Sequence, residues 1–290
     1  MTDPFDWVEL AALGIMLFYF GVRFRRGAAE GISFLRGFAL IAPAAWLAED
    51  TAIHAYGFYA YDPRWHVMLD RMPLMVATIW PFVILSAREL AARLWSRRPA
   101  IVAGGAAIVV FDATLMECVA TSSGLWTWTE PGLFGVPLMG IWGWGCFAAA
   151  CIWLLETLPA RLRPALVILA PALTHALLIA SWWGFFKWIT RPIPDWTTTG
   201  ATIVACLALS AAALRWRRRA RVPLDEMVAR MVAASLFFAL IALHHRGNAP
   251  LIAFALAFAP PWFLLMSTET GAARSTPTGC TPPAGRPRSA

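Results

Sequence analysis

The sequence predicts an all-α protein, a bundle of about nine transmembrane helices, and three observations support this prediction. First, 59% of the 290 residues are hydrophobic and only 14% are charged, whereas soluble domains average about 25% charged residues. Second, the apolar residues gather into runs close to the roughly 20 residues that a helix needs to cross a bilayer. Third, basic and acidic residues alternate between successive runs, which is typical of a chain that crosses a membrane repeatedly.

Nine apolar runs are candidate spans, although eight spans are also possible. The runs cover residues 7–22, 32–48, 72–92, 100–121, 134–157, 164–188, 199–215, 227–243 and 249–266. The seventh and eighth runs have only 17 residues each, near the lower limit for a span. We expect one integral membrane domain over residues 1–266 and a disordered cytoplasmic tail over residues 267–290, which are rich in Ser, Thr, Pro and Gly.

The charges between the runs predict the orientation of the chain. Arginine clusters follow the first, third, fifth and seventh runs, whereas acidic or mixed loops follow the second, fourth and sixth. Under the positive-inside rule, the N-terminus lies outside and the C-terminus lies in the cytoplasm. The same clusters explain the net charge of +7, so we expect the lipid bilayer rather than a nucleic acid as partner. The sequence leaves the oligomeric state open.

A helix–loop–helix pattern occurs twice, which indicates an internal duplication with copies over about 45–95 and 112–163. The matched positions are Glu49 and Glu117, the Gly-x-aromatic-x-aromatic strings at 57–61 and 124–128, the Pro-Leu-Met-x4-Trp strings at 73–80 and 137–144, and Glu89 and Glu156. These positions are separated by 68, 67, 64 and 67 residues. Both copies begin on the same side of the predicted membrane, so we expect parallel repeats with the first pair of glutamates at equivalent helix ends.

Carboxyl groups at membrane depth are the leading candidates for catalytic residues, because a charge inside a span is costly and usually faces the bundle interior. Asp112 and Glu117 lie inside the fourth run, and Glu49 and Asp50 lie at the outer end of the second. Five residues correspond to about 140° around a helix, so we expect only one of Asp112 and Glu117 to face a given pocket. An interhelical hydrogen bond without catalysis stays open as the alternative, as does a solvated helix end for Glu49.

Aromatic residues beside the paired glutamates are candidates for binding a substrate or a carbocation. They are Tyr56, Tyr59, Tyr61, Trp126, Trp128 and Trp144. The face of an aromatic ring attracts a cation by about 0.5–2 kcal/mol. His175, near the middle of the sixth run, is a further candidate, with a histidine that only packs or binds backbone carbonyls as the alternative.

The sequence offers no motif for a metal or a cofactor. No pair of histidines with metal-ligand spacing accompanies the acids, and neither a Gly-rich phosphate loop nor a nucleophile elbow occurs. We therefore expect chemistry without a metal or a cofactor.

Two segments carry a resemblance to a known family. They are Asp112-x4-Glu117 with Gly124-Leu125-Trp126-Thr127-Trp128, Gly135-Val136-Pro137 and Gly143-Trp144, and the earlier Glu49 with Tyr56-Gly57-Phe58-Tyr59-Ala60-Tyr61 and Pro73 to Trp80. On these residues the chain resembles the carotenoid biosynthesis protein family, which includes the bacterial C-1′,2′ carotenoid hydratases. The first motif is about three residues shorter than in the family, and Cys118 stands where proline is usual. The resemblance implies a bacterial inner-membrane enzyme that adds water to the ψ end group of a carotenoid without a redox cofactor.

The residues and the resemblance together predict acid-initiated chemistry on a hydrophobic polyene or isoprenoid. We expect neutral Glu117 to protonate a terminal double bond, because apolar surroundings favour an uncharged carboxyl group. Glu49 or Asp50 then acts as the base on an attacking water, and Asp112 has a supporting role. Two alternatives stay open. One is a membrane lycopene or terpenoid cyclase that uses the same acid, and the other is a non-catalytic transporter or pigment- or lipid-binding protein.

Overall fold

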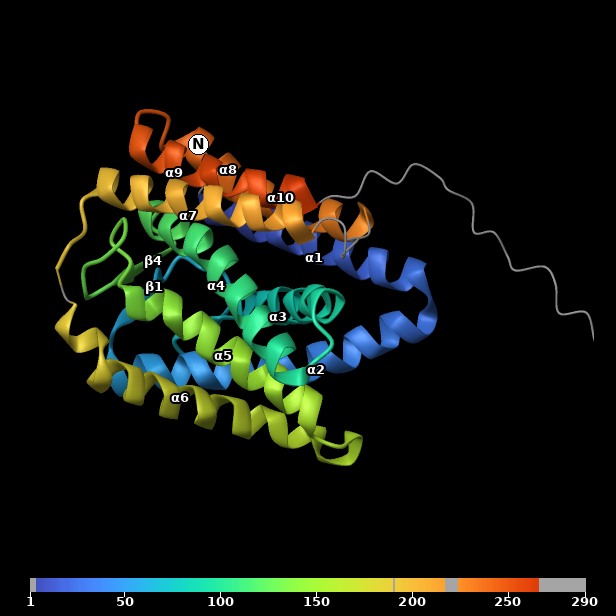
Figure 1. The fold of residues 1–290 in the computed structure, drawn as a ribbon. Helices are drawn as coiled ribbons and strands as arrows, with labels where there is room; N and C mark the ends of the chain where they lie inside the picture. The colour runs from blue at the N-terminus through green and yellow to red at the C-terminus, as the bar shows by residue number, and fades with distance from the viewer. Residues whose placement is uncertain (1–3, 190, 217–223, 266–290) are drawn as a thin grey trace, which may run out of the picture.

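The computed structural model describes residues 4–189, 191–216 and 224–265, and it shows a helical bundle (Figure 1). Its α-helices are α1 (Pro4–Arg26), α2 (Ala28–Tyr56), α3 (Leu74–Leu94), α4 (Arg98–Ser122), α5 (Leu138–Thr157), α6 (Leu166–Gly184), α7 (Asp195–Trp216), α8 (Leu224–His244), α9 (Ala249–Ala257) and α10 (Ala259–Leu265). Short strands are β1 (Tyr59–Tyr61), β2 (Met68–Leu69), β3 (Met72–Pro73) and β4 (Trp126–Trp128), and 3₁₀ turns are η1 (Ala160–Ala165) and η2 (Phe186–Trp188). The predicted tail at 267–290 lies outside the described residues.

Eight of the described helices, α1 to α8, are long and apolar enough to cross a membrane, which confirms the prediction of an all-α transmembrane bundle. Large apolar side chains also point outward from them, as at Leu10, Ile168 and Val204. Such exposure is costly in water but not in lipid. The helices are therefore suited to a hydrocarbon environment.

The ninth predicted span differs from the others because it is divided into α9 and α10. The two helices together cover an apolar segment, Ala249–Leu264, that is shorter than 18 residues. Pro260 and Pro261 lack backbone N–H groups and cannot continue α9, but they fit the first turn of a new helix. The break at Phe258 therefore has a local cause in the sequence.

The helices form two groups around a shared centre. Helices α2 to α6 pack against one another, whereas α7, α9 and α10 form a separate cluster, and α1 and α8 join the two groups. In Figure 1 the cluster of α7 to α10 lies along one side of the bundle and α2 and α6 lie along the other, with α3, α4 and α5 between them. The helices that carry the paired glutamates are therefore held inside the first group.

The two copies of the sequence duplication have the same local structure. One copy consists of α2, β1 and α3, and the other of α4, β4 and α5. The chain turns out of α2 at Gly57 and out of α4 at Gly124. Their φ angles are 61° and 75°, in a region that glycine adopts without strain. Pro73 and Pro137 directly precede the two second helices. The strands join the copies, because β1 and β4 pair antiparallel.

Arg23 ties α1 to three other helices at the end of the bundle opposite these strands. Its side chain is 0% exposed, and its guanidinium donates to Glu89 of α3, to Glu226 of α8 at 2.9 Å and to Glu30 of α2 at 3.2 Å. It also donates to the hydroxyl of Tyr19 at 2.5 Å. Because Glu226 is buried as well, loss of the arginine would leave a buried carboxylate whose remaining counter-charge, Arg26, lies 3.4 Å away.

Replacing Arg23 by glutamine should therefore destabilise the bundle by about 3–5 kcal/mol, the usual cost of breaking a buried ion pair from one side. Thermal unfolding of the purified protein in detergent measures the effect. Arg25→Gln is the matched control, since Arg25 is exposed on the same helix and its loss should change stability by less than about 0.5 kcal/mol. Equal melting temperatures for the two variants would show that the Arg23 network is not a structural tie.

Candidate active site

Glu49 lies in a cage of three hydrogen-bond donors from the first copy of the duplication. The hydroxyl groups of Tyr59, at 3.1 Å, and Tyr61 donate to its Oε2. Nε1 of Trp80 donates to its Oε1 at 2.5 Å. Strand β1 and helix α3 thus supply all three donors to a carboxyl group near the end of α2.

Glu117 lies in an equivalent cage built from the second copy. The indole Nε1 groups of Trp126 and Trp128 donate to its Oε2 at 2.8 and 3.0 Å. Nε1 of Trp144 donates to its Oε1 at 2.7 Å. The side chain is 4% exposed, so these indoles replace the water that would otherwise solvate the carboxyl group.

The two cages are joined directly through their aromatic residues. In the β1–β4 pairing, Tyr59 lies opposite Trp128 and Tyr61 lies opposite Trp126. The rings of Trp80 and Trp144 stack with their centroids 3.9 Å apart. The residues that the duplication aligns therefore meet around one centre, which the sequence alone left open.

A cavity of about 90 Å³ lies between the cages and is lined by both Glu49 and Glu117. Most of its remaining lining is aromatic, including Phe147 of α5. Gly140 makes room for this lining, because a Cβ atom there would lie 2.6 Å from the ring of Trp128. Two carboxyl groups thus face one small, mainly apolar space.

The partners of the two glutamates differ in what they can do chemically. An indole N–H can only donate a hydrogen bond, whereas a phenol hydroxyl can donate or accept one. The ionised carboxylate of Glu117 can therefore accept all three hydrogen bonds from the indoles, and none of these partners can accept a proton from Glu117. Glu49 can instead donate a proton toward Tyr59 or Tyr61 if that hydroxyl turns.

The hydroxyl groups of the two tyrosines keep their protons at neutral pH. Burial, and then the nearby carboxylate of Glu49, raise the pKa of Tyr59 and of Tyr61 well above the usual value for tyrosine. Both residues belong to β1, outside the long helices. They therefore serve as neutral donors or acceptors and not as phenolates.

Tyr56 and His175 lie at the edge of the cavity. The hydroxyl of Thr51 donates to the backbone carbonyl of Leu47, so it accepts a hydrogen bond from Nε2 of His175 at 2.8 Å. The other nitrogen, Nδ1, is hydrogen-bonded to the hydroxyl of Tyr56 at 2.8 Å. His175 therefore positions Tyr56, which lines the cavity, whereas His175 itself does not.

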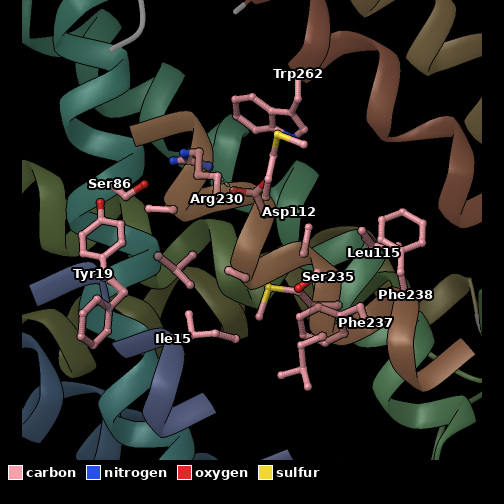
Figure 2. A pocket seen from close by; sticks show the side chains of 18 of the residues that line it. Ile15, Tyr19, Ser86, Asp112, Leu115, Arg230, Ser235, Phe237, Phe238 and Trp262 are labelled. Atoms are coloured by element: carbon pink, nitrogen blue, oxygen red, sulfur yellow. Dashed lines mark hydrogen bonds and ion pairs between the residues drawn. The ribbon is translucent and has the colours of Figure 1, made fainter. Parts of the chain in front are cut away.

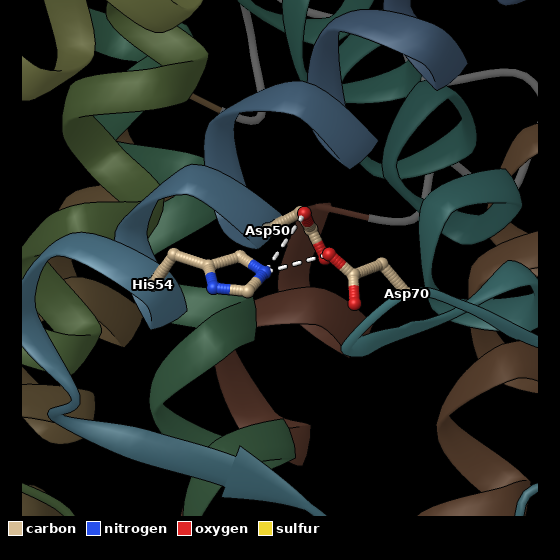
Figure 3. A group of neighbouring side chains, drawn as sticks. All are labelled: Asp50, His54 and Asp70. Atoms are coloured by element: carbon tan, nitrogen blue, oxygen red, sulfur yellow. Dashed lines mark hydrogen bonds and ion pairs between the residues drawn. The ribbon is translucent and has the colours of Figure 1, made fainter.

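Asp50 faces away from the cavity, although it is adjacent to Glu49 in the sequence. Successive residues point about 100° apart around a helix. Asp50 accepts from the backbone N–H of Arg71 at 3.0 Å, and it lies near His54, which binds Asp70 at 2.6 Å (Figure 3). The ligand atoms of Asp50, His54 and Asp70 lie within 4.8 Å of one another, and the hydrogen bond between His54 and Asp70 accounts for this arrangement.

Asp112 is also separated from the cavity of the two glutamates. It accepts from Nη1 of Arg230 on α8 at 2.8 Å and lines a different cavity. The structure thus places Asp112 and Glu117 in different pockets, in agreement with their spacing of five residues. No local pattern in the sequence indicates that α8 supplies this partner.

Trp80 hydrogen-bonds Glu49 but is not among the candidate site residues that the sequence indicated. The signal was present, because Trp80 matches Trp144 in the Pro-Leu-Met-x4-Trp strings. Pro73 and Pro137 start their helices, and seven further residues make about two turns. Equal offsets from the two helix starts therefore bring the two indoles to equivalent positions.

Comparison with known proteins identifies one family. A family model described as carotenoid biosynthesis protein matches residues 8–191, which is more than half of the chain. No curated protein and no solved structure matches the chain. The matched segment contains both cages.

Replacing Gly140 by alanine should destabilise the protein by about 1–3 kcal/mol, because an added methyl group must displace the ring of Trp128. Gly143→Ala is the matched control, since a Cβ atom there meets only Leu178 at an ordinary 3.5 Å. Thermal unfolding of both variants measures the difference. A Gly140→Ala protein as stable as Gly143→Ala would contradict the tight contact between Gly140 and Trp128.

Proposed function

The chain belongs to the carotenoid biosynthesis protein family, and from that premise we propose that it adds water to a terminal carbon–carbon double bond of a carotenoid within the membrane. The observation that carries the proposal is the single cavity lined by both Glu49 and Glu117. Hydration of an alkene needs one group that gives a proton to carbon and one that takes a proton from water. Two carboxyl groups facing one apolar space supply this pair.

We assign the role of general acid to Glu49 and the role of general base to Glu117. This is the reverse of the assignment expected from the sequence. Its support is the difference in partners, since Glu117 meets only indole donors, whereas the hydroxyl groups around Glu49 can accept. An acid must keep its hydrogen bonds when neutral, and a base must keep them when ionised.

The reaction then balances without a further reactant. The proton of Glu49 goes to the less substituted carbon of the double bond, and the π electrons form the new C–H bond. Water bonds to the tertiary cation and loses a proton to the carboxylate of Glu117. Transfer of that proton back to Glu49 restores the site, and the product is a tertiary alcohol.

The aromatic lining supports the cationic stage of this reaction. The rings of Trp80 and Trp144 and of Tyr59 border the cavity, and ring faces attract a cation by about 0.5–2 kcal/mol each. Two carboxyl groups that share the cavity add a nearby negative charge. We propose that this lining stabilises the tertiary cation until water reaches it.

The size of the cavity favours hydration over cyclisation. A volume of about 90 Å³ is well below the roughly 300–1,000 Å³ that is usual for ligand pockets. We infer that this space receives only the end of a polyene chain. A cyclase must instead hold a whole folded ring with its methyl groups.

We also propose a bacterial inner membrane as the location, with the N-terminus outside and the C-terminus in the cytoplasm. The support is the alternation of arginine clusters and acidic loops between the helices.

Expression in a lycopene-accumulating bacterial host should yield a pigment that is heavier by one water. Glu49→Gln should lower its formation by at least about 100-fold, the usual contribution of a general acid. Mass-resolved chromatography of the extracted pigments measures both results. An isomer of unchanged mass from the unmodified protein would favour a cyclase, and unchanged pigment bound to the purified protein would favour a non-catalytic pigment-binding protein.

The two glutamate variants should also fail in different ways. In Glu117→Gln, the acid still protonates the alkene, but no base activates water, so the cation returns its proton. When membranes that already contain unlabelled lycopene are transferred to D₂O, the recovered substrate should therefore carry deuterium with Glu117→Gln and none with Glu49→Gln. The opposite pattern would restore the assignment of Glu117 as the acid, and protein levels in the membrane control for folding.

A further inference from the structure

A second and larger cavity lies on the other side of α3 and α4 from the paired glutamates. It has a volume of about 440 Å³ and is lined by α1, α3, α4, α8 and α10. Trp80 lines the small cavity, whereas its neighbours Ile79 and Val83 line the large one. The two cavities are therefore distinct, and we call the second the Arg230 cavity.

The wall of the Arg230 cavity is mainly apolar, and its polar side chains are Tyr19, Ser86, Ser235, Asp112 and Arg230. Aliphatic, phenylalanine and methionine side chains make up most of the lining, with Ile15, Leu115, Phe237 and Phe238 labelled in Figure 2. A volume in the range of about 300–1,000 Å³ is usual for ligand pockets. Flexible methionines such as Met116 and Met231 suit such a pocket to a flexible chain.

The charged groups in this wall are the ion pair between Arg230 and Asp112. Nη1 of Arg230 donates to Asp112 at 2.8 Å, and the guanidinium lies over the ring of Trp262 with its Cζ atom 4.8 Å from the ring centroid. The remaining edge of the guanidinium, Nε and Nη2, is buried and has no hydrogen-bond partner. Buried N–H groups without an acceptor are costly and rare.

We propose that the Arg230 cavity binds an uncharged apolar chain that ends in a hydroxyl group, such as an isoprenoid or fatty alcohol. The oxygen of the hydroxyl accepts from the unpartnered edge of Arg230 after a small shift of the side chain. Its proton is donated to Asp112, whose side chain remains 21% exposed. A hydroxyl group is suited to this pair because it donates and accepts at once.

Charge complementarity excludes an anionic ligand as the preferred occupant. Asp112 already neutralises Arg230, so the pair has no net charge. A carboxylate or phosphate bound at Arg230 would lie beside the carboxylate of Asp112 and be repelled. The hydroxyl group is therefore favoured over the acid of the same chain length.

Binding of radiolabelled geranylgeraniol to the purified full-length protein in nanodiscs tests this proposal without relying on the proposed hydration. We expect saturable binding that is at least 10-fold tighter than that of the corresponding acid or of the corresponding hydrocarbon. An acid that binds more tightly than the alcohol, or a hydrocarbon that binds equally well, would overturn the proposal.

The binding site can be located with two variants, each of which fills a different cavity. Ala234→Leu adds volume in the Arg230 cavity, and Gly143→Leu adds volume in the cavity of the two glutamates. Geranylgeraniol should bind at least 10-fold more weakly to the first variant and unchanged to the second. The reverse result would place the alcohol between the glutamates and reject the Arg230 cavity as its site.

Variants of the ion pair test the recognition itself. Asp112→Asn leaves the charge of Arg230 uncompensated, so the preference should change from the alcohol to the acid. Arg230→Gln should weaken alcohol binding at least 10-fold, whereas Arg88→Gln, which removes an arginine from the ion pair with Glu156 elsewhere, should not. An unchanged preference in a folded Asp112→Asn protein would contradict the assigned role of the pair, and Ala234→Leu decides the outcome if the charge variants do not fold.

Discussion

The hydrogen bonds to two carboxyl groups inside the bundle, the buried Glu117 and the partly buried Glu49, are the constraint on which the rest of this structure depends. A carboxyl group removed from water inside an apolar bundle is costly unless donors replace its solvation. Here six side chains provide those donors, three to Glu49 and three to Glu117. Because four of the six are carried by β1 and β4, the short strand pair holds the two helices that bear the glutamates in one register.

The site is built from two structurally equivalent parts that differ in their side chains. Both copies form the same cage because their helices end and begin at equivalent positions. The first helix of each copy ends at Gly57 or Gly124, and the second begins after Pro73 or Pro137. The copies differ at the strand positions, with tyrosine in one and tryptophan in the other. That difference changes what each carboxyl group can do with a proton, because a hydroxyl group can reverse its hydrogen bond and an indole cannot. A nearly symmetric scaffold thereby provides chemically different partners.

The sequence predicted the helices, the duplication and the residues of both cages except Trp80, because apolar periodicity, glycine and proline act locally. It did not predict which residues meet across the bundle. Asp50 follows Glu49 directly yet faces a loop, because of the 100° rotation per residue. The partner of Asp112 comes from α8, 118 residues away, and no local pattern encodes such a contact. The division of the ninth predicted span follows from paired prolines whose local effect a hydropathy average conceals.

The protonation of the two glutamates in the resting protein tests the account most directly. Infrared spectroscopy of the purified protein detects the C=O stretch of a neutral carboxyl group, which shifts when the proton is exchanged for deuterium. The account predicts one such band that disappears in Glu49→Gln and persists in Glu117→Gln, since only the partners of Glu49 can accept from a neutral acid. A band that disappears in Glu117→Gln and persists in Glu49→Gln would contradict the assignment of acid and base.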